Sequence, residues 1–229
     1  MSIKKLIFSI LALPIMMSCE SIDSSDINLE TPIYQDYSMT YNQTNNTTHI
    51  NATFRVKDEN GVRLRLSKGA SVLFNGESED FFNTLSDHFY HWKRQGAIDV
   101  EVEYKKNSKT SFTNTLSVNR VPYIAFKNDF NSLSFENKNM ISWNGEAIQQ
   151  DEVVSINIIQ KKRSYFSKFE KEGSFNIEIP SLKSLGFTAG SAEINLSKTH
   201  TIYDIENADK PSGGRISYTN LIVKAIEVK

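Results

Sequence analysis

The stretch Ala52-Thr53-Phe54-Arg55-Val56-Lys57-Asp58-Glu59-Asn60-Gly61-Val62-Arg63-Leu64-Arg65-Leu66 decides the fold class. Apolar and polar side chains alternate in residues 52–56 and again in residues 62–66, which is the period of a strand with one buried and one solvated face. Residues 58–61 between them are of the types that form turns. The stretch is therefore predicted to form an antiparallel hairpin.

The same alternation, bounded by turn residues, recurs along the rest of the chain. The further predicted strands are residues 71–74, 89–93, 98–104, 111–118, 140–143, 153–160, 174–179, 192–200 and 216–228. One segment, from Ser78 to Asp87, has helical spacing and is expected to form a short helix. Because strands do not alternate with helices, the sequence predicts an all-β protein built from antiparallel sandwiches.

Two domains and a tether are expected in the mature chain. Arg120-Val121-Pro122 is interpreted as a joint, because proline lacks the amide hydrogen that a sheet ladder needs and fixes an extended backbone. The predicted β-sandwich domains are residues 47–121 and 122–229. The strands at 111–118 and 216–228 are expected to close the first and the second sandwich without sharing strands. Residues 19–46 contain few apolar side chains and many Ser, Asp, Asn and Thr, so they are expected to form a flexible tether.

The composition excludes several classes of protein. The chain of 229 residues has 26 basic and 27 acidic side chains, and its formal net charge of −1 gives no overall field that would attract nucleic acid. Hydrophobic residues make up 39% of the chain and include 14 Phe, 9 Tyr and 2 Trp, enough for packed cores. A nucleic-acid partner and a wholly disordered chain are therefore not expected.

Residues 1–18 differ from the rest of the chain. Two lysines precede an apolar run from Leu6 to Met17, and the small residue Ser18 stands directly before Cys19. This three-part pattern is typical of a secretory signal peptide. The apolar run would span about 18 Å as a helix, which is too short to cross a bilayer.

The segment Ile15-Met16-Met17-Ser18-Cys19 resembles the lipobox of bacterial lipoprotein precursors, although Met16 stands where that family usually has leucine. The resemblance implies that the peptide is cut before Cys19, that the Cys19 thiol carries a lipid and that the new amino terminus is acylated. Several acyl chains would anchor the protein to a membrane without spanning it. Glu20 follows in place of the aspartate that retains some lipoproteins in the inner membrane, which favours the outer membrane. An ordinary secreted protein cut elsewhere is the alternative.

The segment Ile141-Ser142-Trp143-Asn144-Gly145 resembles the central strand of immunoglobulin-like domains, in which an inward tryptophan anchors the core. Cys19 is the only cysteine of the chain, so the disulfide-bearing antibody type is excluded. The resemblance therefore implies two antiparallel immunoglobulin-like β-sandwich domains of a cysteine-free variety.

The densest cluster of aromatic and imidazole side chains lies in one predicted strand. Tyr90 and Trp92 share a face of this strand and could form an exposed platform for a sugar ring. The alternative is that Trp92 belongs to the core of the first domain, as Trp143 does to that of the second. His88 and His91 fall on opposite faces, so no metal site is expected there.

Two acidic segments are further candidates. Three carboxylates share one face of a predicted strand and could bind calcium or act as acid and base. The favoured interpretation is pairing with Arg63 and Arg65 on another strand, or plain solvation. These carboxylates are Asp99, Glu101 and Glu103. The loop 204–214 carries several oxygen-bearing side chains without calcium-loop spacing, so a polar loop without a cation is favoured there.

The sequence contains no framed nucleophile, phosphate-binding loop or cofactor motif. We therefore expect a membrane-anchored bacterial lipoprotein of the cell envelope that binds or scaffolds an unidentified protein or glycan, without catalysis and without a metal or cofactor. Two alternatives remain open. One is a carbohydrate-binding surface adhesin acting through Tyr90 and Trp92. The other is a polysaccharide hydrolase using acids such as Asp99, Glu101 or Asp209.

Overall fold

A computed structural model describes residues 21–78, 81–84 and 87–229, with the backbone alone at residues 81–84 and 87–89. Within these residues the regular elements are strands and two 3-10 turns, so the predicted all-β class is confirmed. The same residues contain no helix with the length and hydropathy needed to cross a membrane. The elements are β1 (Ser21–Asp23), η1 (Ser24–Asp26), β2 (Ile33–Asn42), β3 (Thr47–Val56), β4 (Arg63–Arg65), β5 (Ser71–Phe74), β6 (Glu77–Ser78), β7 (Phe81–Thr84), β8 (Asp87–Gln95), β9 (Val100–Asn107), β10 (Thr110–Leu116), η2 (Val118–Arg120), β11 (Ile124–Phe126), β12 (Ser132–Leu133), β13 (Asn139–Gly145), β14 (Glu152–Gln160), β15 (Arg163–Phe169), β16 (Asn176–Ile179), β17 (Gly190–Tyr203) and β18 (Gly214–Val228).

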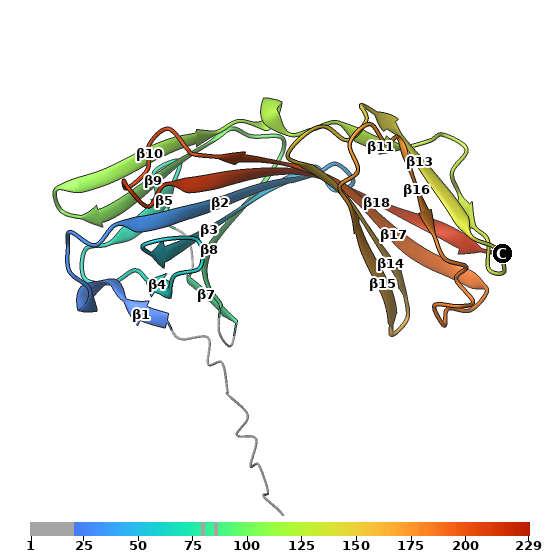
Figure 1. Ribbon diagram of the computed structural model, residues 1–229, viewed down its shortest axis with the longest axis horizontal. Helices are drawn as coiled ribbons and strands as arrows, with labels where there is room; N and C mark the ends of the chain where they lie inside the picture. The colour runs from blue at the N-terminus through green and yellow to red at the C-terminus, as the bar shows by residue number, and fades with distance from the viewer. Residues whose placement is uncertain (1–20, 79–80, 85–86) are drawn as a thin grey trace, which may run out of the picture.

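The described strands form three sheets. The largest has eleven strands in the order β1-β4-β3-β2-β18-β17-β14-β15, with β8 and β7 joined at β3 and β12 joined at β18. The other two are a four-stranded sheet, β10-β9-β5-β6, and a three-stranded sheet, β11-β13-β16. Figure 1 shows the large sheet as an arch, with one small sheet over each half of its convex side.

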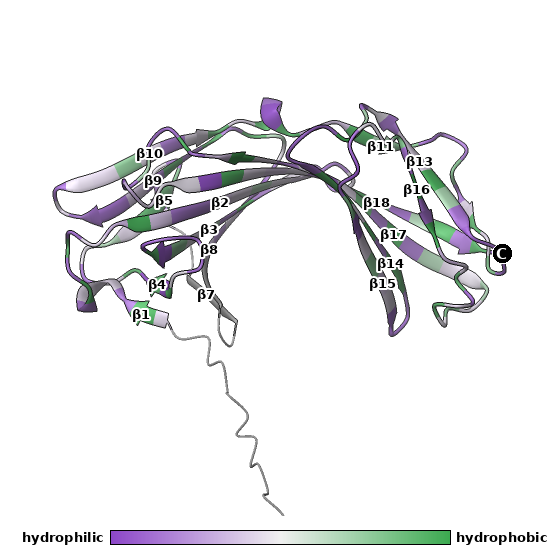
Figure 2. Ribbon diagram, in the orientation of Figure 1, coloured by the Kyte–Doolittle hydropathy of each residue, from purple (hydrophilic) through white to green (hydrophobic). Residues whose placement is uncertain are grey.

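Each half of the arch encloses its own hydrophobic core between the large sheet and a small one. The first core contains Trp92, which is 2% exposed, and the second contains Trp143, which is 1% exposed. The prediction of one core tryptophan in each half is therefore confirmed. Figure 2 shows the alternation of hydrophobic and hydrophilic residues along the strands that produces these buried faces.

The two cores share strands β17 and β18. Ile216 and Tyr218 of β18 lie in the first core, whereas Ile226 and Val228 of the same strand lie in the second. The expectation that residues 216–228 close the second sandwich without sharing strands is wrong. The physical reason is length, because a strand of 15 residues spans about 50 Å and reaches both halves. Whether residues 47–121 and 122–229 are separate folding units is tested by unfolding of the isolated fragment 122–229.

The predicted tether is wrong for residues 33–42. They form β2, which lies in the middle of the large sheet, antiparallel to β3 and parallel to β18. Ile33, Tyr37 and Met39 are fully buried on one face of this strand, and polar residues occupy most of the other. The polar average composition of the segment concealed a strand that alternates.

The helix expected over residues 78–87 is wrong where the structure describes it. Residues 81–84 form β7, antiparallel to β8, and the remaining part includes positions outside the described residues. Short apolar runs are ambiguous between helix and strand, and pairing with β8 decides the outcome here.

Candidate functional site at the junction of the two cores

The inward side chains of β17 are apolar in each core and polar between the two cores. Ala192, Ile194 and Leu196 pack in the second core, and Ile202 packs against the first. Lys198 and His200 lie between them at the same inward positions of the alternation. The sheet therefore presents polar side chains where the two covering sheets leave a gap.

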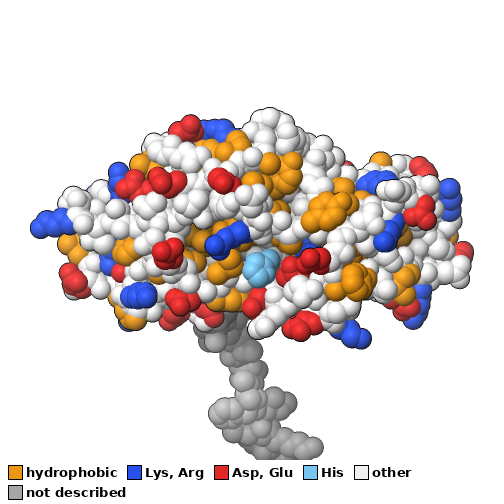
Figure 3. All heavy atoms as spheres, turned by 90° about the horizontal axis from the view of Figure 1, so that it is seen from above, with side chains coloured by type: hydrophobic (Ala, Val, Ile, Leu, Met, Phe, Trp, Pro, Cys, Tyr) orange, Lys and Arg blue, Asp and Glu red, His pale blue; other side chains and the backbone are white. Residues whose placement is uncertain are grey.

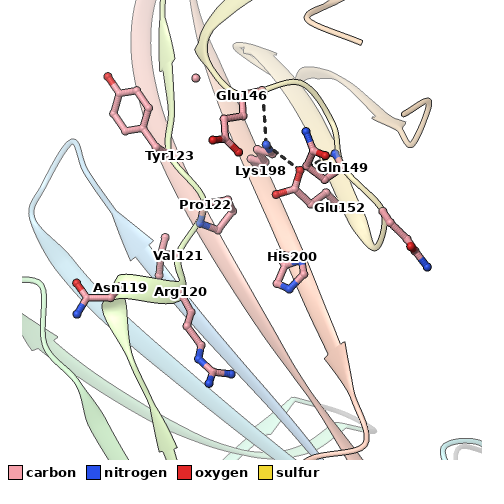
Figure 4. A pocket seen from close by; sticks show the side chains of 12 residues that line it. Asn119, Arg120, Val121, Pro122, Tyr123, Glu146, Gln149, Glu152, Lys198 and His200 are labelled. Atoms are coloured by element: carbon pink, nitrogen blue, oxygen red, sulfur yellow. Dashed lines mark hydrogen bonds and ion pairs between the residues drawn. The ribbon is translucent and has the colours of Figure 1, made fainter. Parts of the chain in front are cut away.

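Lys198 is 1% exposed and is held by three groups. Its ammonium lies 2.8 Å from a carboxylate oxygen of Glu152 and donates to the carbonyl oxygens of Glu146, at 3.3 Å, and Ala147, at 3.1 Å. A buried ammonium has three hydrogens to satisfy, and these partners supply the acceptors. The bonds fix the loop after β13 onto the large sheet (Figure 4).

Glu152 completes this arrangement from the start of β14. The Oε2 atom that pairs with Lys198 also accepts the backbone N–H of Gln149 at 2.7 Å. In Figure 4 the second carboxylate oxygen points into the pocket beside Lys198. The ion pair is therefore buried and holds the loop in place, and the second carboxylate oxygen of Glu152 can accept a hydrogen bond from a ligand in the pocket.

The chain segment between the two small sheets forms the opposite wall. Asn220 of β18 donates to the carbonyl of Pro122 at 2.9 Å, and Gln43 donates to Asn220 at 2.7 Å and to the carbonyl of Ile124 at 2.9 Å. Gly145 approaches this wall so closely that a Cβ atom would lie 2.6 Å from the carbonyl oxygen of Tyr123. Since Gly145 also has a φ of 130°, this contact needs glycine.

These walls enclose a pocket of about 550 Å³. Its lining residues are Asn119, Arg120, Val121, Pro122, Tyr123, Gly145, Glu146, Gln149, Gln150, Glu152, Lys198 and His200. In Figure 4 the glutamates lie at one end, with Gln149, whereas His200 and Arg120 lie towards the other. The pocket therefore offers hydrogen-bond acceptors at one end and cationic or imidazole donors at the other.

The predicted sugar platform is not present. Tyr90 is 7% exposed and Trp92 2% exposed, and both belong to the first core. The Tyr90 hydroxyl accepts the backbone N–H of Leu66 at 2.7 Å, and the Trp92 indole donates to Glu77 at 3.3 Å. Both side chains are directed inward because β8 pairs with β3 in the large sheet and presents this face to the first core. The alternative of core packing is therefore confirmed for Trp92.

The three carboxylates of the acidic row have separate surroundings. Asp99 precedes β9 and accepts from the Ser117 hydroxyl and the Val118 backbone N–H, which caps η2. Glu101 is exposed, and Glu103 lies 3.5 Å from Lys105. Pairing with Arg63 and Arg65 is wrong, because those arginines lie on β4 in a different sheet from β9. The alternative of solvation agrees with the exposed side chain of Glu101.

The loop 204–214 packs onto the first core. Asp209 accepts the backbone N–H of Ile33 at 2.9 Å and pairs with Lys106 at 2.8 Å, where both side chains are about nine-tenths buried. Burial raises the pKa of the nearby Tyr104 hydroxyl, and the Asp209 carboxylate raises it further. Asp209 thus joins the loop to β2 and β9.

The histidines form no metal-binding group within the described residues. His49 and His91 are neighbours on the uncovered face of the large sheet, with ring centroids 5.7 Å apart. One nitrogen of each ring has a protein partner, which is the Thr47 hydroxyl for His49 and the Asn51 side chain for His91. Cys19, the predicted lipid attachment site, lies outside the described residues.

Sequence reasoning missed Lys198, His200 and Arg120, the charged and imidazole groups of the junction pocket. The available signal was the apolar alternation of residues 192–202, which continues through two polar inward positions. In a search against known proteins, no protein-family model matches this chain, and no curated protein matches it.

Proposed function

We propose that this protein is a membrane-anchored bacterial lipoprotein that acts outside the cytoplasm as a binding or scaffolding module. The lipobox-like residues 15–19 and the signal-like residues before them support the anchor. The residue after Cys19 supports the outer membrane as its location. Each two-layered half, with its core tryptophan, resembles an immunoglobulin-like sandwich. The two halves differ from separate domains of that kind because they share β17 and β18.

The junction pocket is the single observation that carries the binding role. Its volume of about 550 Å³ is within the usual range for small-ligand sites, and hydrogen bonds fix two of its walls in advance. Acceptors at Glu146 and Glu152 and donors at Arg120 and His200 match a polar ligand that donates at one end and accepts at the other. Sugars and peptide segments have this chemistry.

The anchor is tested with Cys19→Ser. Loss of the acyl chains should move the protein from the detergent-soluble membrane fraction to the soluble extracytoplasmic fraction, or leave an unprocessed precursor. The mass of the wild-type amino-terminal peptide should show the added lipid. Membrane residence that is unchanged by the substitution, together with no added mass, would overturn the lipoprotein proposal.

The pocket is tested by screening saccharides and short peptides against the full chain by ligand-observed nuclear magnetic resonance. For a ligand found in this way, Arg120→Ala and His200→Ala should each lower the affinity about tenfold, the value of one lost charged or polar contact. Lys171→Ala changes an exposed residue outside the pocket lining and is the matched control. Equal affinity in all three variants would place the binding elsewhere.

We infer a role without catalysis because none of the acids considered for hydrolysis lines the pocket. Asp99 and Asp209 have structural partners, and Glu101 is exposed on β9. Asp99 caps η2, and Asp209 is held by Lys106 and by the backbone of Ile33. Glu146 and Glu152 are the carboxylates of the pocket, so a hydrolase would have to use them. Incubation with cell-wall and storage polysaccharides should release no reducing ends above a Glu146→Gln/Glu152→Gln control. Release that depends on both residues would overturn this inference.

A further inference from the structure

The residues that the structure describes include a strand close to the expected lipid site. Strand β1 starts at Ser21 and pairs in parallel with β4. The Asp23 carboxylate forms a two-bond ion pair with Arg65. The Ser24 hydroxyl donates to the carbonyl of Ser67 at 2.9 Å and accepts the Ser67 backbone N–H at 2.7 Å. These bonds fasten the amino-terminal end of the described chain to the first half of the protein.

This attachment changes the reach of the anchor. A flexible tether over residues 19–46 would have a root-mean-square span of about 30 Å and would let the folded part turn freely. The chain from Cys19 to Ser21 spans at most about 7 Å, whatever its conformation. A lipid on Cys19 would thus bring β1 to the surface of the bilayer.

The position of β1 determines which side of the protein faces that surface. Figure 1 shows β1 on the underside of the arch, at the edge of the large sheet, and shows the green coil of η2 at the top. The junction pocket is lined by Asn119 and Arg120 of η2, so it lies on the side opposite β1. Figure 3 looks onto that opposite side, where charged, hydrophobic and polar side chains are interspersed.

We propose that the short link to Cys19 places β1, η1 and the turn at residues 66–69 against the polar headgroups of the bilayer and directs the junction pocket away from it. This inference rests on the lipid anchor of the proposed function. Charge is not the cause, because this part of the surface carries both signs. Lys68 and Asp26 are oppositely charged there, and Arg65 is already paired with Asp23.

The test uses the full lipidated protein in phosphatidylcholine vesicles that contain a nitroxide-headgroup lipid. Cys19 is the only cysteine, and its thiol would be held in the thioether, so an introduced cysteine takes a single fluorophore. Ser25→Cys labels η1 and Gln150→Cys labels the pocket rim, and both positions are exposed. The nitroxide should quench the label at position 25 at least several-fold more than the label at position 150.

A matched variant inserts twenty Gly and Ser residues between Glu20 and Ser21. The lipid and the fold are kept, and quenching at position 25 should fall to that at position 150. Quenching at position 25 should also persist in high salt, which would remove an electrostatic contact. Equal quenching at both positions without the insertion, or loss of the difference in salt, would overturn the orientation. Failure of the anchor is recognised separately, because a protein without lipid has no added mass and does not float with the vesicles.

Discussion

Replacing Lys198 by methionine tests whether the junction is held by a buried ion pair. Methionine has a similar length and keeps the packing of the aliphatic part, but it removes the ammonium. Glu152 would then keep a carboxylate that is 9% exposed and has lost its counter-ion, and the carbonyls of Glu146 and Ala147 would lose their shared donor. Breaking one side of such a pair costs about 3–5 kcal/mol.

The structure places the expected cost at the lower end of this range. One oxygen of Glu152 points into the open pocket, where water can reach it, and the Gln149 backbone N–H still donates to the other (Figure 4). We therefore expect Lys198→Met to lower the free energy of unfolding by about 3 kcal/mol. With a urea dependence near 3 kcal/mol per molar for a chain of this size, the unfolding midpoint should fall by about 1 M.

The assay is equilibrium unfolding in urea, followed by tryptophan fluorescence, since Trp92 and Trp143 report on separate cores. The double variant Lys198→Met/Glu152→Gln removes both charges, and a glutamine oxygen can still accept from Gln149. It should recover most of the loss, because the cost comes from the stranded charge. A cost below about 1 kcal/mol for the single variant, or no recovery in the double variant, would refute the reasoning.

Three further predictions follow from the packing. Trp92→Ala and Trp143→Ala should each lower the free energy of unfolding in urea by about 3–5 kcal/mol. The control Met140→Ala changes a side chain that is 58% exposed and should alter stability by less than about 0.5 kcal/mol. A small effect at either tryptophan would contradict its role as a core anchor. The fragment 122–229 should not fold alone, because its β18 would lack the pairing with β2 and would expose residues of the first core. A cooperative thermal transition of the fragment would show that the two halves fold independently. Burial lowers the pKa of His49, and the charges of Lys93 and His91 lower it further. The unfolded chain therefore binds a proton at His49 more readily than the folded chain does. The free energy of unfolding should fall as the pH drops below about 6.5. His49→Gln should reduce this fall between about pH 7.5 and 5.5 in urea unfolding, and an unchanged pH profile would exclude His49 as its source.

The alternation of apolar and polar residues predicted most of the long strands because it reports directly on which face is buried. The hairpin at residues 52–66 and the strand at 71–74 are present as expected. Strand β2 was missed because average composition was used in place of its period, although Ile33, Tyr37 and Met39 alternate as clearly as residues of the other strands. Composition describes a whole segment, whereas a strand needs apolar side chains on only one of its faces.

The pairing of strands far apart in the sequence could not be predicted in the same way. A parallel partnership between β2 and β18 joins residues near the two ends of the chain, and no local pattern encodes it. The same is true of the Lys106 to Asp209 ion pair, which fastens a loop that was weighed as a cation site. Such contacts form only when the tertiary packing brings the partners together. A local sequence pattern therefore predicts solvent or a ligand as the partner of these polar residues.

The junction pocket nevertheless has a signature that follows from the architecture. A sheet shared by two cores must cross a gap between its two covers, and connecting loops pack on it there. The backbone carbonyls of those loops need donors, which Lys198 and Asn220 supply here. Polar inward residues are therefore expected at the same level on neighbouring strands. Lys198 of β17 and Asn220 of β18 are direct cross-strand partners, and both lie at inward positions between the apolar residues of the two cores. When two neighbouring predicted strands carry polar residues at paired inward positions, those positions mark the boundary between two cores. The polar side chains at that boundary are then candidates for lining a binding site.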